Sequence, residues 1–149
     1  VTFAENDEKL LEQIKINCRL NKISKKRYRI IQSDVFEAMR SNPSTSLRTK
    51  FDFVWANPPY IPEVRRNKVQ DSVLKYEPEE ALFGGKDGLF YIGKFLKEAK
   101  NFLNSGGEIF MEFDSLQRNK VNAMLKKYKY KTWEFRKDQY GKWRYAAIS

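Results

Sequence analysis

Residues 51–60 read FDFVWANPPY, an apolar run that stops at Asn57 and two prolines. Phe, Val and Trp favour extended backbone, and a short run of this kind is typical of a buried parallel strand. Proline has no backbone N–H for the ladder, so Pro58 and Pro59 end the strand. The stretch therefore predicts a buried strand over residues 51–56 with the polar side chain of Asn57 at its carboxyl end.

The sequence before this strand alternates strand-like and helix-like patterns. Asn6 and Asp7 are suited to cap a helix, and Leu11, Ile14 and Cys18 follow at helical spacing. The predicted elements are strands over residues 1–5 and 28–32, a helix over 8–20, a helical turn over 36–40 and a surface loop over 41–50.

The sequence after the strand begins with an irregular excursion over residues 58–86 that is rich in proline and charge. Excursions of this length in compact domains are usually functional. Beyond it, apolar residues recur at three and four positions, which indicates helices, and Gly141 marks a turn. The predicted elements are a helix over 88–104, a strand over 108–113, a helix over 115–128 with Leu116, Val121, Met124, Leu125 and Tyr128 inward, and a hairpin of strands over 131–137 and 143–148.

Strands that alternate with helices predict an α/β sandwich with a mostly parallel sheet, here with an antiparallel C-terminal hairpin. A chain of 149 residues is enough for one domain, so we expect a single domain over residues 1–149. Ligands of such sheets bind at the carboxyl ends of the strands. The polar residues predicted at these ends are Glu5, Asp34, Asn57 and Glu112 or Asp114.

Composition limits the chemistry. With one cysteine and no histidine, the chain has no internal disulfide and no zinc site built on thiolates and imidazoles, and we expect no metal. There is no apolar run of membrane-spanning length and no visible targeting leader, so we expect an intracellular protein. The formal charge of +10 invites a polyanionic partner such as nucleic acid, although solvated basic helix faces produce the same count.

The tetrapeptide Asn57-Pro58-Pro59-Tyr60 carries the most specific chemistry. Two prolines fix the backbone and donate no hydrogen bonds, so a carbonyl beside them can remain a free acceptor. The Asn57 side-chain oxygen supplies a second acceptor and Tyr60 a ring for stacking. Together they suit a planar amine or amide, although two prolines can also simply end a strand.

The tetrapeptide resembles the signature of class I methyltransferases that methylate planar nitrogens with S-adenosylmethionine. Further matches within that class follow in order: NPPYIP at 57–62, YEP at 76–78, ALFGGKDGL at 81–89, SGG at 105–107, then Gly141 and Arg144. In this order and spacing, over essentially the whole chain, the sequence is similar to the HemK/PrmC-type release factor glutamine methyltransferases. The resemblance implies the Rossmann-like fold of that class.

The resemblance also assigns site residues. It implies that Glu5 binds the ribose hydroxyls of S-adenosylmethionine, and that Asp34 and Val35 contact its adenine. It places the substrate glutamine amide on Asn57 and the Pro58 carbonyl, beside the cofactor, with Pro59 and Tyr60 completing the wall. Taken alone, Glu5 could be a helix-capping acid and Asp34 a turn former.

The implied activity is N5-methylation of the glutamine in the Gly-Gly-Gln motif of class 1 peptide-chain release factors, in the cytoplasm or mitochondrial matrix. Two alternatives remain open at this point. The charge and the shared tetrapeptide also fit an amino-methyltransferase acting on adenine or cytosine in nucleic acid. The second alternative is a basic binding module that keeps the scaffold without activity.

One departure from the family pattern stands out. The glycine-rich cofactor loop and the strand before it should precede Glu5, and neither is present. We therefore expect the C-terminal portion of a longer methyltransferase, which alone binds the cofactor poorly or not at all. The glycines at 84, 85 and 88 lack phosphate-loop spacing, and we expect them to serve positive φ angles and close packing.

Overall fold

The computed structural model describes residues 1–40 and 50–149. The predicted surface loop over residues 41–50 therefore lies, except for Lys50, outside the described residues. The chain divides into two compact units, Val1–Thr49 and Lys50–Ser149, and each is described by itself. The expectation of a single domain stays a prediction.

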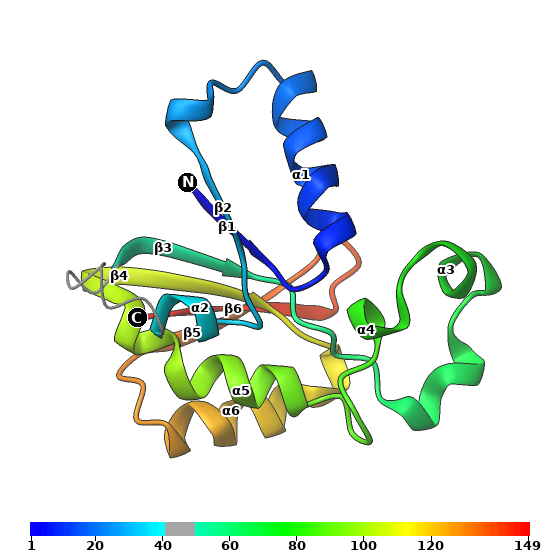
Figure 1. Ribbon diagram of the computed structural model, residues 1–149. Coiled ribbons are helices and arrows are strands. Elements are labelled where there is room, and N and C mark those ends of the chain that lie inside the picture. Colours follow the sequence, from blue (N-terminus) through cyan, green and yellow to red (C-terminus); the bar gives the residue numbers. More distant parts are fainter. Residues whose placement is uncertain (41–49) are drawn as a thin grey trace. The chain divides into compact units, whose positions relative to one another are not determined.

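The first unit is a strand–helix–strand unit followed by one helical turn (Figure 1). Its strands β1 (Thr2–Glu5) and β2 (Arg29–Gln32) pair in parallel, with Glu5 opposite Gln32. Asp7 caps helix α1 (Glu8–Leu20) by accepting a hydrogen bond from the Lys9 amide, which satisfies one of the free N–H groups of its first turn. The other elements are a 3-10 turn (Lys25–Arg27) and α2 (Glu37–Arg40). This matches the predicted order of elements.

The second unit contains a four-stranded sheet with the order β3-β4-β6-β5. Its strands are β3 (Phe51–Ala56), β4 (Leu103–Glu112), β5 (Trp133–Lys137) and β6 (Trp143–Ile148). β3 and β4 are parallel, whereas β6 runs antiparallel to both β4 and β5. The predicted antiparallel hairpin is confirmed, and Gly141 in its turn has a φ of +75°.

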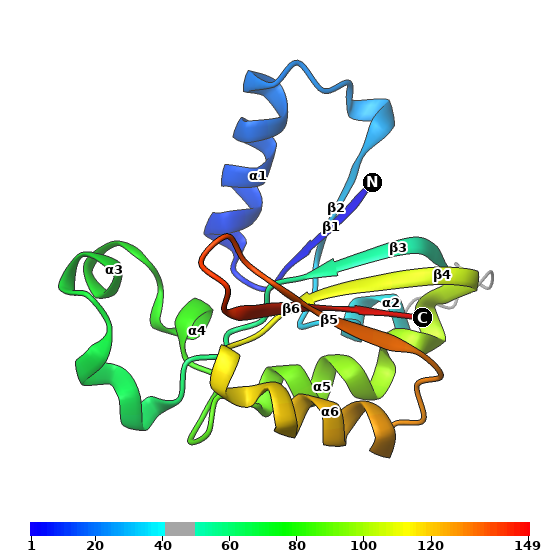
Figure 2. The same ribbon diagram turned by 180° about the vertical axis from the view of Figure 1, so that it is seen from behind.

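Helices α5 (Phe90–Glu98) and α6 (Arg118–Lys127) cover one face of this sheet (Figures 1 and 2). Apolar side chains from both helices and from the facing strands form the core of the unit. Burial of each such side chain contributes about 1.5–3 kcal/mol relative to exposure. The core residues with at most 1% exposure are Ile92, Leu96, Ala99, Ile109, Met111, Phe113, Val121, Leu125, Ala146 and Ile148.

Strand β3 differs from its prediction, because it is not buried. Phe53 and Trp55 are 59% and 75% exposed, and Trp55 stacks on Phe110 of β4 at 4.4 Å. β3 is an edge strand of the four-stranded sheet, and Trp55 lies in register with Phe110 rather than with the buried Ile109. The apolar residues 51–56 therefore form an edge strand, and α5 and α6 do not cover its second face.

Two predicted helices are shorter than expected. The helix predicted over 88–104 is α5 followed by a 3-10 turn, Ala99–Phe102, after which β4 already begins at Leu103. The helix predicted over 115–128 begins as a 3-10 turn, Ser115–Gln117, before α6. Leu116, predicted to point inward, is 80% exposed. At 3.6 residues per turn, a position five residues before Val121 and nine before Leu125 lies on the opposite side of the helix.

The excursion between β3 and α5 folds into three short helical segments. These are a 3-10 helix (Glu63–Lys68), α3 (Asp71–Tyr76) and α4 (Glu79–Leu82). Arg66 makes a bidentate ion pair with Glu79 and lies 4.4 Å over the ring of the buried Phe83. The excursion is thus an ordered part of the second unit.

The described strands form two separate sheets, β1-β2 and β3-β4-β6-β5. Among the described residues, β1 pairs only with β2 and β3 only with β4, so each forms the edge of its own sheet. None of the helices within the described residues is both long and apolar enough to cross a membrane.

Candidate functional site

In the first unit, Glu5 and Asp34 lie at the same end of the two-stranded sheet. The Ser33 amide donates to the Glu5 carbonyl at 2.9 Å, which continues the ladder to the residue before Asp34. Glu5 Oε1 accepts from the amides of Asn6 and Asp7 at 2.6 and 2.9 Å, whereas no described residue donates to Oε2. One carboxylate oxygen is therefore held by the backbone and the other is available as an acceptor.

Val35, next to Asp34, has a left-handed backbone with a φ of +55°. This conformation costs a β-branched residue free energy and persists only where surrounding contacts impose it. The buried Ser33 supplies those contacts, because its hydroxyl donates to the Val35 carbonyl at 3.0 Å and accepts from the Ala38 amide at 3.1 Å. Ser33 thus fixes the turn that carries Asp34 and Val35.

In the second unit, residues 57–60 leave the carboxyl end of β3 beside the end of β4. The Tyr60 hydroxyl donates to Glu112 Oε1 at 2.7 Å, so the last residue of β4 holds the ring. Asn57 is exposed, and no hydrogen bond among the described residues uses its side chain or the Pro58 carbonyl. The two acceptors predicted to bind an amide are therefore free, next to a ring that is held in place.

Burial raises the pKa of Tyr60 from 10.0 to about 12, and its hydrogen bond to the Glu112 carboxylate adds to the rise. The positive charge of Arg144 opposes it. Arg144 is itself paired with Asp138, Nε to Oδ2 at 3.2 Å, within the β5–β6 hairpin. Tyr60 is consequently a neutral hydrogen-bond donor at neutral pH.

We predict that Tyr60 ionises near pH 12. The difference between the tyrosinate absorbance titrations of the unchanged chain and Tyr60→Phe should show one phenol with this midpoint. Because the folded pKa exceeds the unfolded one, the associated stability is fully present below pH 10 and is lost as the pH rises through 12. Glu112→Gln should lower the midpoint yet leave it above 10, because burial remains. A midpoint that Glu112→Gln does not move would contradict the role of Glu112.

The ALFGGKDGL block packs its backbone directly against residues 59–63. The Ile61 amide donates to the Leu82 carbonyl and the Gly84 amide donates to the Ile61 carbonyl, both at 3.0 Å. A Cβ on Gly84 would lie 2.4 Å from the Pro59 carbonyl oxygen, and one on Gly88 would lie 2.1 Å from the Tyr60 carbonyl oxygen. The expectation of close packing is confirmed, and Gly85 and Gly88 also have positive φ angles.

Gln117 joins this block to Tyr60, a role that the sequence patterns did not predict. Its side chain is buried, and Nε2 donates to the carbonyls of Tyr60, Asp87 and Gly88 at 2.9, 3.1 and 3.1 Å. Oε1 accepts from the Asp114 amide at 3.1 Å, as part of a capping box. The only sequence signal for Gln117 is the DSLQ pattern at 114–117, which indicates a helix cap and not a contact with Tyr60.

Asp114 is also built into this arrangement. Its carboxylate accepts from the Leu116 amide at 2.8 Å and pairs with Arg65 at 2.7 Å. The pair is partly buried and ties the excursion to the end of β4. Gln117, Asp114 and the glycine block, together called the brace, hold residues 59–61 in place.

We predict that Gln117→Leu lowers the free energy of unfolding by about 2 kcal/mol, because it leaves three carbonyls and one amide without their buried partner. Urea denaturation measures this. Gln139→Leu, at an exposed position in the hairpin turn, is the matched control and should change stability by less than about 0.5 kcal/mol. Equal effects of the two substitutions would show that Gln117 is not a brace.

The predicted site residues fall into two sets, one in each unit. The structure places Glu5, Asp34 and Val35 together in the first, and Asn57, Pro58, Pro59 and Tyr60 together in the second. The roles of both sets remain predictions. Cys18 is buried in the first unit, as expected of a core residue. Within the described ranges, no three acidic or cysteine side chains are placed to hold a metal ion.

The chain is similar in sequence to curated methyltransferases. It is 39% identical over 112 residues to the release factor glutamine methyltransferase of Clostridium botulinum, which covers 73% of this chain and 40% of that protein. It is 42% identical over 89 residues to the protein of the same name in Clostridium acetobutylicum, covering 60% and 31%. The Francisella tularensis protein of that name is 35% identical over 116 residues, covering 77% and 37%. The chain thus spans about two fifths or less of these relatives. No family model matches it.

Solved structures show the fold. A ribosomal protein L11 methylase from Lactobacillus delbrueckii matches with a TM-score of 0.62 and 16% identity, over 100% of this chain and 56% of that one. A methyltransferase from Pyrococcus furiosus matches with a TM-score of 0.62 and 21% identity, over 99% and 60%. These neighbours confirm the predicted fold class, a Rossmann-like α/β sandwich.

Proposed function

We propose that this chain, which belongs with the release factor glutamine methyltransferases and has the class I methyltransferase fold, carries the amide-binding wall of such an enzyme. The reaction proposed for the whole protein is transfer of a methyl group to the side-chain nitrogen of a glutamine in a release factor. The observation that carries the proposal is the pair of free acceptors, the Asn57 side chain and the Pro58 carbonyl, beside the fixed ring of Tyr60.

An amide NH2 matches these acceptors. Its nitrogen is a weak nucleophile, because its lone pair is delocalised into the carbonyl. Two acceptors that each take one N–H fix the nitrogen and favour a more amine-like lone pair, which then points toward the methyl donor. With the methyl donor bound, the nitrogen would form a bond to the methyl carbon while the bond from that carbon to the sulfonium sulfur breaks, and the sulfur would leave with the electron pair as a neutral thioether. One proton of the nitrogen would leave to water or a nearby acceptor.

The residues of the first unit fit a bound nucleoside. The Oε2 atom of Glu5 is unused among the described residues, and a carboxylate is the natural acceptor for a ribose diol. The Ser33 turn presents Asp34, an acceptor for an exocyclic amine, beside the apolar Val35. We propose S-adenosylmethionine as the cofactor, which supplies an electrophilic methyl group. The residues of this unit that would hold it are Glu5, Asp34 and Val35.

The test is a labelled-methyl assay with the complete gene product that contains this chain. It is offered S-adenosylmethionine with a class 1 release factor, with the same factor carrying Glu in place of the glutamine of Gly-Gly-Gln, or with nucleic acid. Incorporation only into the unchanged factor is expected. Incorporation only into nucleic acid would instead establish an amino-methyltransferase of bases. Labelling of both forms of the factor would show that the methyl group is transferred to a residue other than this glutamine.

The activity of the 149-residue chain alone is a separate question. We expect calorimetric titration of this chain with S-adenosylmethionine to give little or no binding. Micromolar binding by the chain alone would contradict this expectation without affecting the role proposed for Asn57.

A further inference from the structure

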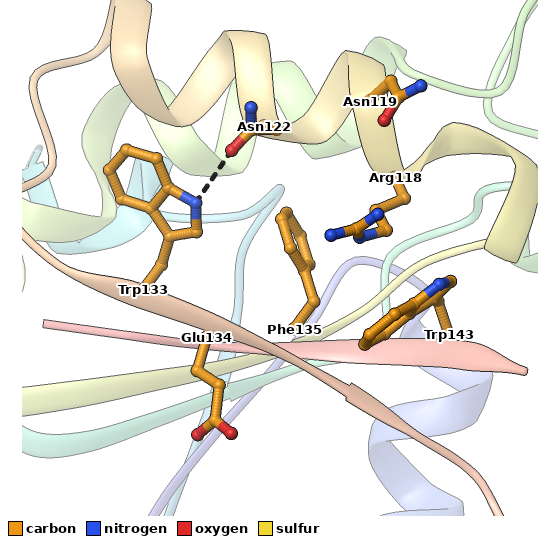
Figure 3. Close-up of a pocket in the computed structure, with 7 residues that line it drawn as sticks. All are labelled: Arg118, Asn119, Asn122, Trp133, Glu134, Phe135 and Trp143. Atoms are coloured by element: carbon orange, nitrogen blue, oxygen red, sulfur yellow. Dashed lines mark hydrogen bonds between the residues drawn. The ribbon is translucent and has the colours of Figure 1, made fainter. Parts of the chain in front are cut away.

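A cavity outside the candidate site lies between helix α6 and the β5–β6 hairpin. It encloses about 360 Å³, at the small end of ligand-binding pockets. Figure 3 shows Trp133 and Phe135 from β5 and Trp143 from β6 facing the helix, with Arg118 between the rings of Phe135 and Trp143. Aromatic rings therefore form its walls, in a part of the molecule that the methyl-transfer proposal does not use.

The guanidinium of Arg118 is bound by rings rather than by an anion. It lies 5.3 Å from the Phe135 centroid and 4.4 Å from that of Trp143. Its Nε is buried without a hydrogen-bond partner, and no described residue accepts from its other nitrogens. A buried donor without a partner costs free energy that a bound acceptor would recover.

The other polar groups at the cavity leave donors as well. Asn122 Oδ1 accepts from Trp133 Nε1 at 2.9 Å, which leaves the Asn122 NH2 group free to donate. Glu134 contributes to the lining, but its carboxylate points to the opposite side of the strand from Trp133 and Phe135 (Figure 3) and pairs with Arg136. The cavity thus offers aromatic faces and donors, and its ligand must supply a flat ring with acceptors.

The segment that supplies most of the cavity's lining is basic, which favours an anionic ligand. Residues 118–142 hold nine of the 29 basic residues and only two of the 19 acidic ones, which concentrates most of the net charge of +10. Eight of the nine are exposed: Lys120, Lys126, Lys127, Lys129, Lys131, Arg136, Lys137 and Lys142. Exposed cations in the same segment as a stacking surface favour single-stranded nucleic acid, in which the cations contact phosphates and the rings contact bases.

We propose that this cavity binds a nucleobase of single-stranded nucleic acid, with guanine preferred. A base stacks on Trp133, because Arg118 and Lys137 lie over the ring of Trp143, and the O6 and N7 acceptors of guanine match the donors of Arg118 and Asn122. The proposal is independent of the methyl-transfer reaction, because no cavity residue belongs to the candidate catalytic set.

The test is fluorescence anisotropy of labelled single-stranded RNA of repeating GU or repeating CU sequence with the 149-residue chain. Tighter binding of the GU strand, by about fivefold or more, is expected. Arg118→Lys keeps the charge but loses the flat fork of donors, so it should abolish the preference and leave the salt dependence between about 50 and 200 mM unchanged. Trp133→Leu should weaken both strands about tenfold.

Controls separate the cavity from general charge. Lys75→Ala removes an exposed cation outside residues 118–142 and should leave both affinities unchanged, and thermal denaturation must show that each variant folds. Displacement of the RNA by free guanosine monophosphate would support the site with a free nucleotide as its ligand. Equal binding of GU and CU strands, an unchanged preference in Arg118→Lys, or equally tight binding of a polyglutamate peptide would overturn the proposal.

Discussion

The substitution Gly88→Ala is expected to lower the free energy of unfolding by roughly 3 kcal/mol. Two costs add: a side chain at a φ of +73°, about 1 kcal/mol, and the overlap of its Cβ with the Tyr60 carbonyl oxygen and with Gln117 Nε2, about 2 kcal/mol. The overlap falls on backbone and on a buried amide, so neither neighbour can move away easily. Urea denaturation of the 149-residue chain measures the loss.

Gly141→Ala is the control that separates the two costs. Gly141 has nearly the same backbone, with a φ of +75°, but a Cβ there meets no atom within 4 Å. Its substitution should cost only about 1 kcal/mol. Equal losses of stability in the two variants would mean that the close approach of Gly88 to Tyr60 does not affect stability. The glycine block would then not support residues 59–61.

The substitution Asn57→Ala is expected to lower kcat/KM for methyl transfer by the complete gene product about 100-fold, with little change in stability. The side chain is exposed and makes no hydrogen bond to any described residue, so its loss costs the fold little. Loss of one preorganised acceptor for the substrate amide removes about 3 kcal/mol of transition-state stabilisation. The labelled-methyl assay and a thermal denaturation curve measure the two quantities.

The matched control for this prediction is Asn67→Ala. Asn67 is an exposed asparagine of the 3-10 helix in the same excursion, so its substitution should alter neither activity nor stability. An Asn57→Ala enzyme with unchanged kcat/KM on release factor would remove the basis of the proposed function. A large loss of stability in Asn57→Ala would assign the residue a structural role instead.

Local patterns in the sequence predicted the order of elements. The spacing of Leu89, Ile92, Leu96, Ala99 and Leu103 predicted a helix face. The first four side chains are buried, whereas Leu103 is half-buried and begins β4. Gly141 predicted the hairpin turn, since its φ of +75° suits glycine. These predictions succeed because helix periodicity and turn conformation depend on neighbours within a few residues. The predicted positions of Asn57 and Glu112 at the ends of neighbouring strands agree with the parallel pairing of β3 and β4.

Non-local contacts were the part that the sequence did not predict. The exposure of Trp55 depends on which elements cover the second face of β3, and an apolar run is the same in either case. The role of Gln117 depends on Tyr60, 57 positions earlier, and on Gly88, 29 positions earlier. Its buried amide satisfies groups that come together only when the chain folds, so its hydrophilic character gave no sign of its place.

The contact between Gly88, Tyr60 and Gln117 constrains how this protein can evolve. Any side chain at position 88 displaces both the Tyr60 carbonyl and the Gln117 amide, so a tolerated replacement requires simultaneous changes in the backbone after the prolines and at position 117. Single substitutions should therefore be eliminated by selection at position 88 while its exposed neighbour Lys86 drifts freely. A library of random variants selected for folding would reveal this as an invariant glycine beside a variable lysine.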